Sequence, residues 1–336
     1  MRVSVVLPAY NAAGHLREAL ESLARQTEPE FETILIDDGS TDDTAGVAKG
    51  FAERDKRFRL VGTPHRGLVA ALECGLSLAR GRYVARMDAD DVAHPERLRR
   101  QADRVDSCPD LGLAACLVEH LGDRQTSEGL ARWVDWTNSL VSPDQIALHR
   151  FVESPLVHPS VMFRREIVER LGGYREGPFP EDYELWLRWL EAGVRMAKVP
   201  EELLSWRERP ERLTRIDPRY SVESFYRVKA PYLARWLERH NPHHPEVVVW
   251  GAGRVSRLRL RFLEAEGVRV SAFVDIDPDK IGQRIGRAPV LGPDALPPPG
   301  ERFVLQWAAA RGARELVGAA LQQRGYRMGL DWLPCG

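Results

Sequence analysis

Three carboxylates stand close together at the end of an apolar run, in the stretch YVARMDADDVAHP over residues 83–95. Asp88, Asp90 and Asp91 fall within four positions, where like charges repel one another. A hard divalent cation such as Mg²⁺ or Mn²⁺ favours oxygen ligands and would offset that repulsion. An acidic turn before the helix that Pro95 begins would explain the same residues, because negative charge is favourable at a helix N-terminus. Taken alone, the stretch is a weak indication of a metal site.

Two more polar clusters follow predicted strands in the first half of the chain. They are Pro8, Ala9, Tyr10 and Asn11 after the run Val3–Leu7, and Asp37 and Asp38 after the run Phe31–Ile36. Strand-like runs alternate here with segments of helical spacing, which predicts a parallel sheet covered on both faces. Such sheets bind ligands beyond the carboxyl ends of their strands. Each cluster alone would fit a solvated loop, but together the three predict a site at this edge.

The next hundred or so residues are less regular. We predict a strand over Leu111–Val118, a helix over Leu130–Arg150 and a strand over Val157–Arg164 that contains His158. A further helix begins at Pro180-Glu181-Asp182, and its apolar stripe leaves Asp182 at the exposed N-terminal end.

Composition limits the classes of function. The 336 residues carry 48 Lys and Arg against 49 Asp and Glu, a formal net charge of −1, which does not favour a nucleic-acid partner. The four cysteines lack the spacing of a zinc or redox motif, so we expect a reduced, cytoplasmic setting. No apolar run approaches the ~18 residues of a membrane helix, and no signal peptide is expected. Peripheral membrane contact and homo-oligomer formation stay open.

A new strand–turn–helix pattern begins the last ninety or so residues, in the stretch VVVWGAGRVSR. Gly251 and Gly253 occupy the positions of a dinucleotide-binding turn, and Asp275 ends the following strand, where an acidic residue would meet a ribose. The fingerprint is partial, because Ser256 takes its third small position. This Rossmann-like domain could bind NAD(P) or another nucleotide, or serve a structural or oligomer-forming role.

The series of motifs resembles the family 2 glycosyltransferases of the GT-A fold over roughly residues 1–215. The resemblance rests on VSVVLPAYNAAGHLREALESLARQT, ILIDDGSTDDT, ARGRYVARMDADD, HPSVMFRREIVERLGGYRE and PEDYELWLRWLEAG. It implies an α/β nucleotide-diphospho-sugar transferase fold, with a mostly parallel central sheet and helices on both faces. Residues 1–107 would form the nucleotide-sugar half and 108–215 the acceptor half. A helical linker over 216–245 and the smaller Rossmann-like α/β domain over 246–336 would follow.

The resemblance also implies roles for single residues. In the donor half, Pro8, Ala9 and Tyr10 would line the nucleotide base, and Asp38 would contact it. Asn11 and Asp37, beside them, would belong to the same nucleotide-sugar site. Asp88 would lie near the ribose, and Asp90, with Asp88 and Ala89 beside it, would hold Mn²⁺ or Mg²⁺ on the diphosphate. Asp182, next to Glu181, would be the general base, since an ionised carboxylate can accept the acceptor's hydroxyl proton. A helix N-terminal charge is the simpler alternative for Asp182.

Three residues leave alternatives open. His158 would be an acceptor-site residue or a structural histidine, and Trp186 would touch the acceptor or, as its helical spacing favours, pack in the core. Arg209 stands where the family often places a histidine that completes the metal site, so it would instead pair with the diphosphate.

The resemblance implies a hexosyltransferase-type enzyme that transfers a sugar, with inversion, from a nucleoside-diphosphate sugar to an acceptor hydroxyl. UDP-sugars are favoured as donors. A glycan, a lipid-linked glycan, a protein or a small molecule would serve as acceptor. Alternatives are a sugar-nucleotide oxidoreductase that uses the C-terminal domain, a catalytically degenerate nucleotide-sugar-binding protein, and a nucleotidyltransferase.

Overall fold

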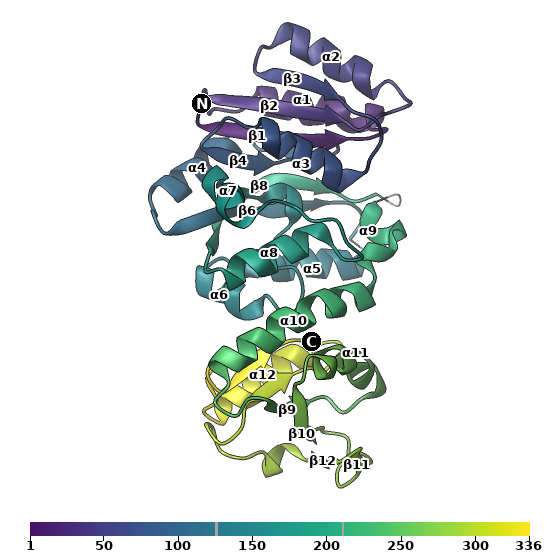
Figure 1. Cartoon of the computed structure of the whole chain (residues 1–336), viewed down its shortest axis with the longest axis vertical. Coiled ribbons are helices and arrows are strands. Elements are labelled where there is room, and N and C mark those ends of the chain that lie inside the picture. The colour runs from purple at the N-terminus through teal and green to yellow at the C-terminus, as the bar shows by residue number, and fades with distance from the viewer. Residues whose placement is uncertain (125–126, 210–211) are drawn as a thin grey trace. The chain divides into compact units, whose positions relative to one another are not determined.

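The computed structural model of the chain describes residues 1–124, 127–209 and 212–336 (Figure 1). Pro210, at the end of the segment that holds Arg209, lies outside the described residues. Contacts group the chain into two compact units. Unit 1 comprises Met1–Ile146, Pro155–Gly177 and Ala192–Ile216, and unit 2 comprises Ala147–Ser154, Pro178–Glu191 and Asp217–Gly336.

Unit 1 is built on an eight-stranded sheet of order β3-β2-β1-β4-β7-β6-β8-β5. Its strands are β1 (Val3–Ala9), β2 (Phe31–Asp37), β3 (Phe58–Gly62), β4 (Tyr83–Arg86), β5 (Val92–Ala93), β6 (Leu111–Leu121), β7 (Met162–Arg164) and β8 (Arg195–Arg207). The run β3-β2-β1-β4 is parallel, β6 pairs parallel to β8, and β7 and β5 pair antiparallel to their neighbours. Every residue of β1 and β2 is buried, so both faces of the sheet are covered, as predicted.

The helices of unit 1 follow from the apolar spacing of their sequences. They are α1 (Ala13–Ala24), α2 (Thr44–Arg54), α3 (Leu68–Leu78), α4 (Arg97–Asp106), α5 (Glu128–Ser139), α7 (Arg165–Leu171) and α9 (Leu213–Ile216). In α1, Leu16, Leu20 and Leu23 recur on one face and are fully buried. This helix packs against α2, whereas α3 packs against β1 and β2.

Two sequence predictions of local structure are wrong. The predicted helix Leu130–Arg150 is two helices, α5 and α6 (Pro143–His149), and α6 begins at a proline, which suits a first turn but not a helix interior. The predicted strand Val157–Arg164 is a strand only from Met162 onwards. Residues 158–160 form a 3₁₀ turn around Pro159, whose nitrogen cannot donate to a sheet.

Unit 2 contains a six-stranded sheet of order β11-β12-β10-β9-β13-β14, parallel except for β11. Its strands are β9 (Glu246–Trp250), β10 (Arg269–Val274), β11 (Arg284–Ile285), β12 (Ala288–Leu291), β13 (Val304–Gln306) and β14 (Trp332–Pro334). Its helices are α8 (Glu181–Glu191), α10 (Val222–His240), α11 (Arg254–Ala265) and α12 (Ala313–Gln323). Within the described ranges, every helix is too short or too polar to cross a membrane.

Candidate active site

The register of the first sheet brings three of the predicted clusters to one edge of unit 1. Ala9, the last residue of β1, lies opposite Asp37, the last residue of β2. Val6 lies opposite Arg86, at the end of β4, and the Met87 N–H donates to the Val6 carbonyl at 3.1 Å. The loops that carry Tyr10, Asp38 and Asp88 therefore all begin at the carboxyl ends of neighbouring parallel strands.

The Asp38 carboxylate is held by the loop that follows β3. Its two oxygens accept hydrogen bonds from the N–H groups of Arg66 at 2.9 Å and Gly67 at 2.8 Å. His65 Nδ1 lies 2.9 Å from Asp38 Oδ2, and the His65 ring stacks on Tyr10 with centroids 4.0 Å apart. Tyr10 remains 47% exposed, so the stacked pair offers a flat surface to solvent. His65 was not predicted from the sequence, although it follows β3 and so lies beyond a strand end, like the predicted residues.

Asn11 and Gly39 fix the two loops against each other. Asn11 adopts φ of 48°, and its side-chain oxygen accepts the Thr41 N–H at 2.8 Å while its own N–H donates to Ser40 Oγ at 2.9 Å. Gly39 has φ of 72°, and a Cβ there would lie 2.7 Å from the His65 nitrogen. Only glycine fits both this backbone conformation and this close approach. The Asp-Asp-Gly-Ser turn is thereby a rigid wall of the site.

The predicted carboxylates gather into a compact triad. One oxygen from each of Asp88, Asp90 and Asp91 lies within 4.8 Å of the others. Asp90 is 8% exposed and Asp91 is fully buried. Asp91 Oδ1 accepts the Arg207 N–H at 2.9 Å, whereas Asp91 Oδ2 is buried without a hydrogen-bond partner among the described residues. An orphaned buried carboxylate oxygen beside two further carboxylates fits a divalent cation.

Arginines compensate the charge of the triad. Only Arg209 among them was singled out from the sequence, and there as a contact of the diphosphate. Arg209 Nε lies 2.8 Å from Asp90 Oδ2, and Arg212 approaches Asp88 at 3.8 Å. The buried Arg86 also forms an ion pair with Asp88. Arg86 ends β4, two positions before the triad, but Arg212 comes from a segment far along the chain and carries no local sequence signal.

Burial and mutual repulsion perturb the triad. Burial, and then the neighbouring Asp88 charge, raises the pKa of Asp90, although Arg209 and Arg212 oppose the shift. Burial raises the pKa of Asp91 well above its usual range, and the charges of Asp88 and Asp90 add to this. A bound cation would reverse these shifts, because it stabilises the ionised form.

His158 lies in unit 1, in the 3₁₀ turn before β7. Its Nε2 is 2.7 Å from the Tyr174 hydroxyl. Burial, with the positive charge of Arg86, lowers the pKa of His158 well below its usual range, so the ring is neutral at pH 7.

The other predicted catalytic residues begin α8, in unit 2. Glu181 is buried, and its Oε2 accepts the Tyr220 hydroxyl at 2.6 Å. Asp182 is half-buried, and its Oδ1 lies 2.7 Å from the Tyr183 nitrogen. Trp186, one turn further on, is fully buried and packs edge-to-face on Trp189.

Comparison with known proteins identifies the family. The model of glycosyl transferase family 2 matches residues 4–172, half of the chain. EpsE of Bacillus subtilis, named as a candidate glycosyltransferase, is 32% identical over 66% of this chain and 79% of its own length. The amylovoran biosynthesis glycosyltransferase AmsE of Erwinia amylovora is 32% identical over 61% of this chain and 75% of its own. The chain belongs to glycosyltransferase family 2.

The fold agrees with this assignment. The crystal structure of S. aureus TarS 1–349 in complex with UDP-GlcNAc matches with a TM-score of 0.55 at 20% identity, covering 70% of this chain and 67% of TarS 1–349. The predicted GT-A fold is thus confirmed, and the protein is a sugar-transferring enzyme.

In this glycosyltransferase, the Gly251-Ala252-Gly253 turn connects β9 to α11, as the sequence order predicts. Gly251 has φ of 130°, and a Cβ there would lie 2.9 Å from the Ala308 backbone. Asp275 Oδ2 accepts the Ala252 N–H at 3.0 Å, Oδ1 accepts the Asp277 N–H at 3.1 Å, and Lys280 lies 3.3 Å away. Both carboxylate oxygens therefore have partners within unit 2, where they brace the turn.

Proposed function

We propose that this enzyme transfers a sugar from a nucleoside-diphosphate sugar to an acceptor hydroxyl, with inversion and with a divalent cation at the triad. The observation that carries the proposal is the triad itself: three carboxylates within 4.8 Å at the strand ends, one with an orphaned buried oxygen. The stacked Tyr10 and His65 rings, beside Asp38, offer a surface suited to a nucleotide base. TarS was solved with UDP-GlcNAc, which makes UDP-sugars the first donors to test.

Asp182 is the proposed general base. As the new bond forms between the acceptor oxygen and the anomeric carbon, its carboxylate takes the hydroxyl proton, and the bond from that carbon to the diphosphate breaks. Attack from the face opposite the leaving group inverts the configuration. Asp90 and Asp88, with Asp91, would hold Mn²⁺ or Mg²⁺, which stabilises negative charge on the departing diphosphate. Arg209 and Arg212 would then contribute positive charge from their side of the triad.

Replacing Asp182 with asparagine tests this assignment. We expect donor binding, measured by calorimetry with Mn²⁺ and a panel of UDP-sugars, to stay within about twofold of the unaltered enzyme. Release of UDP during transfer or slow donor hydrolysis should fall by about 10²-fold or more, because a positioned base typically contributes 10²–10⁴-fold. Glu238→Gln, at an exposed carboxylate of unit 2, is the matched control. Unchanged turnover in the Asp182→Asn variant would remove Asp182 from the mechanism.

For the second sheet we propose a supporting role, because Asp275 is engaged by its own turn. Binding of NAD(P), measured by calorimetry, would overturn this and favour the nucleotide-binding alternative.

A further inference from the structure

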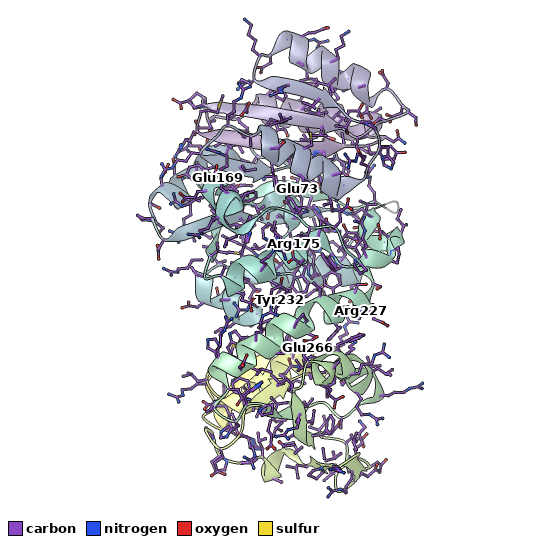
Figure 2. The ribbon with its side chains drawn as sticks, viewed as in Figure 1. Glu73, Glu169, Arg175, Arg227, Tyr232 and Glu266 are labelled. Carbon is purple, nitrogen blue, oxygen red and sulfur yellow. The ribbon has the colours of Figure 1, made fainter. Side chains whose placement is uncertain are left out.

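A pocket of about 290 Å³ lies within unit 2, close to the lower end of the range for small-molecule sites, ~300 Å³. It is formed by the end of α6, the residues after it, the C-terminal half of α8 and the C-terminal half of α10. Six large apolar or aromatic side chains line it: Leu148, Phe151, Leu187, Leu190, Tyr232 and Trp236. Figure 2 marks Tyr232 on α10. The glycosyl-transfer proposal assigns none of these residues a role.

The charged groups of the pocket do not balance. Its one carboxylate, Glu191, is engaged by Arg235 through two hydrogen bonds of 2.7 and 3.0 Å. Arg239 lies 3.9 Å from the same carboxylate, and Arg150 lines the pocket beside it. The pocket is therefore lined by two guanidinium groups and by one carboxylate that Arg235 already engages, which leaves excess positive charge in the pocket.

Arg150 is the lining residue whose charge indicates that the pocket binds an anion. Its guanidinium lies over the Phe151 ring, 4.9 Å from the centroid, and forms neither a hydrogen bond nor an ion pair with the described residues. Burial lowers its pKa to about 10, so it is still charged at pH 7. Arg150 is half-buried, so an anion in the pocket would supply the hydrogen-bonded ion pair that this cation lacks.

The aromatic side chains of the pocket indicate which kind of chemical group is attached to the anion. Trp236 and His240, one turn apart on α10, stack with centroids 4.4 Å apart and an interplanar angle of 11°. The exposed side chain of Arg239 places the rim of the pocket at the surface. We propose that this pocket binds a small anion, a phosphate or carboxylate, carried on an apolar ring, with Arg150 as the main anion contact and Arg239 at the entrance.

Phenyl phosphate is the probe, with inorganic phosphate and benzyl alcohol as partial probes that lack the ring or the charge. We expect calorimetry on the full chain to show phenyl phosphate binding at least about tenfold more tightly than either partial probe, because both parts of the pocket contribute. Arg150→Gln should weaken phenyl phosphate at least about tenfold without lowering the stability of the ligand-free protein. Arg239→Gln should weaken phenyl phosphate binding by a few-fold. Because the Arg239 side chain is exposed at the rim, this substitution should leave the fold intact.

Arg227→Gln is the matched control, since Arg227 lies on the same helix, pairs with Glu223 and is 58% exposed (Figure 2). Saturating UDP with Mn²⁺ should leave the phenyl phosphate affinity unchanged, which separates this pocket from the proposed donor site. Equal binding by the Arg150→Gln variant, competition by UDP, or no binding at millimolar concentration would each overturn the proposal. Loss of glycosyl transfer in an Asp182→Asn variant has no bearing on it.

Discussion

Arg209 defines the chemistry of the triad at the scale of a single residue. The family resemblance leads one to expect a histidine in this segment as a further metal ligand, and here a guanidinium, 33% exposed, pairs with Asp90 instead. A cation that binds Asp90 must displace this ion pair or share the carboxylate with it. In the proposed mechanism, Arg209 would compete with the metal while no diphosphate is bound and would turn to the diphosphate when one is present.

Replacing Arg209 with histidine should therefore strengthen metal binding. We expect the dissociation constant for Mn²⁺, measured by electron paramagnetic resonance without donor, to fall by about tenfold, since removing a close charge and adding an imidazole ligand are together worth ~1–2 kcal/mol. Arg25→His, at an exposed residue that ends α1, should leave it unchanged. Asp90→Asn should weaken Mn²⁺ strongly. If Arg209→His left the affinity unaltered, Arg209 would have no part in the metal site.

At the scale of elements, helices and strands were predicted correctly where their local apolar pattern alone determines them. β1, β2 and β4 were foreseen because buried parallel strands appear as short apolar runs, and their polar ends located Asp37, Asp88 and the loops that hold them. The full length of β8 was not predicted, because Pro200 and two glutamates interrupt its apolar run. Its bulged pairing with β6 sustains the strand through that interruption, and such long-range pairing is not visible in local periodicity.

The candidate active site was also predicted only in part, because long-range contacts leave no local sequence signal. Asp88, Asp90 and Asp91 were predicted from their own stretch, but their respective partners Arg212, Arg209 and Arg207 come from the end of β8 and beyond. Only Arg209 had been singled out, and that came from the family resemblance. Which cation meets which carboxylate depends on pairing between segments more than a hundred residues apart, so that pairing cannot be derived from spacing.

β8 also carries a buried lysine that makes stability depend on pH. Lys198 is 2% exposed, its Nζ donates to the Thr137 side chain at 2.8 Å and to the Thr137 carbonyl, and burial lowers its pKa to about 7. In the unfolded chain the pKa of this lysine returns to its ordinary value of 10.5. Above pH 7 the unfolded chain thus binds more protons than the native state, so the free energy of unfolding rises with pH.

We expect denaturant unfolding to show stability increasing from pH 7 to about pH 8.5, by at most ~1.4 kcal/mol per pH unit for this lysine. Above that range the cysteines of the unfolded chain ionise, whereas burial raises the pKa of Cys116 in the native state, and this opposes the trend. Lys198→Met should flatten the slope for the transition that unfolds unit 1. Lys49→Met, at an exposed lysine of the same unit, should keep it. A slope that Lys198→Met leaves intact would assign the pH dependence to other groups.

At the scale of the whole molecule, the two compact units are not two consecutive stretches of the sequence. The sequence suggests a first domain that ends near residue 215, but residues 147–154 and 178–191 group with the C-terminal part. Phe151, Tyr183 and Leu187 share one core with α10 and the second sheet. Lys229 of α10 donates to the carbonyls of Phe151 at 2.7 Å and Cys335 at 2.8 Å.

A chain cut after residue 245 should therefore lose more than an appended domain. The cut removes the core partners Val247, Val249, Leu305, Trp307 and Leu333, each at most 2% exposed. Each such side chain contributes roughly 1.5–3 kcal/mol of burial, whereas a whole domain is stable by only about 5–15 kcal/mol. Because α8 begins with Glu181 and Asp182 and packs in this core, the proposed base would be left on an unsupported helix.

We expect the shortened chain to aggregate or to melt at a much lower temperature in differential scanning calorimetry, and to lose transfer activity. If it instead purified as a monomer with the full chain's melting temperature and donor affinity, the α8 segment would be independent of the second sheet, and the boundary near residue 215 suggested by the sequence would be the functional one.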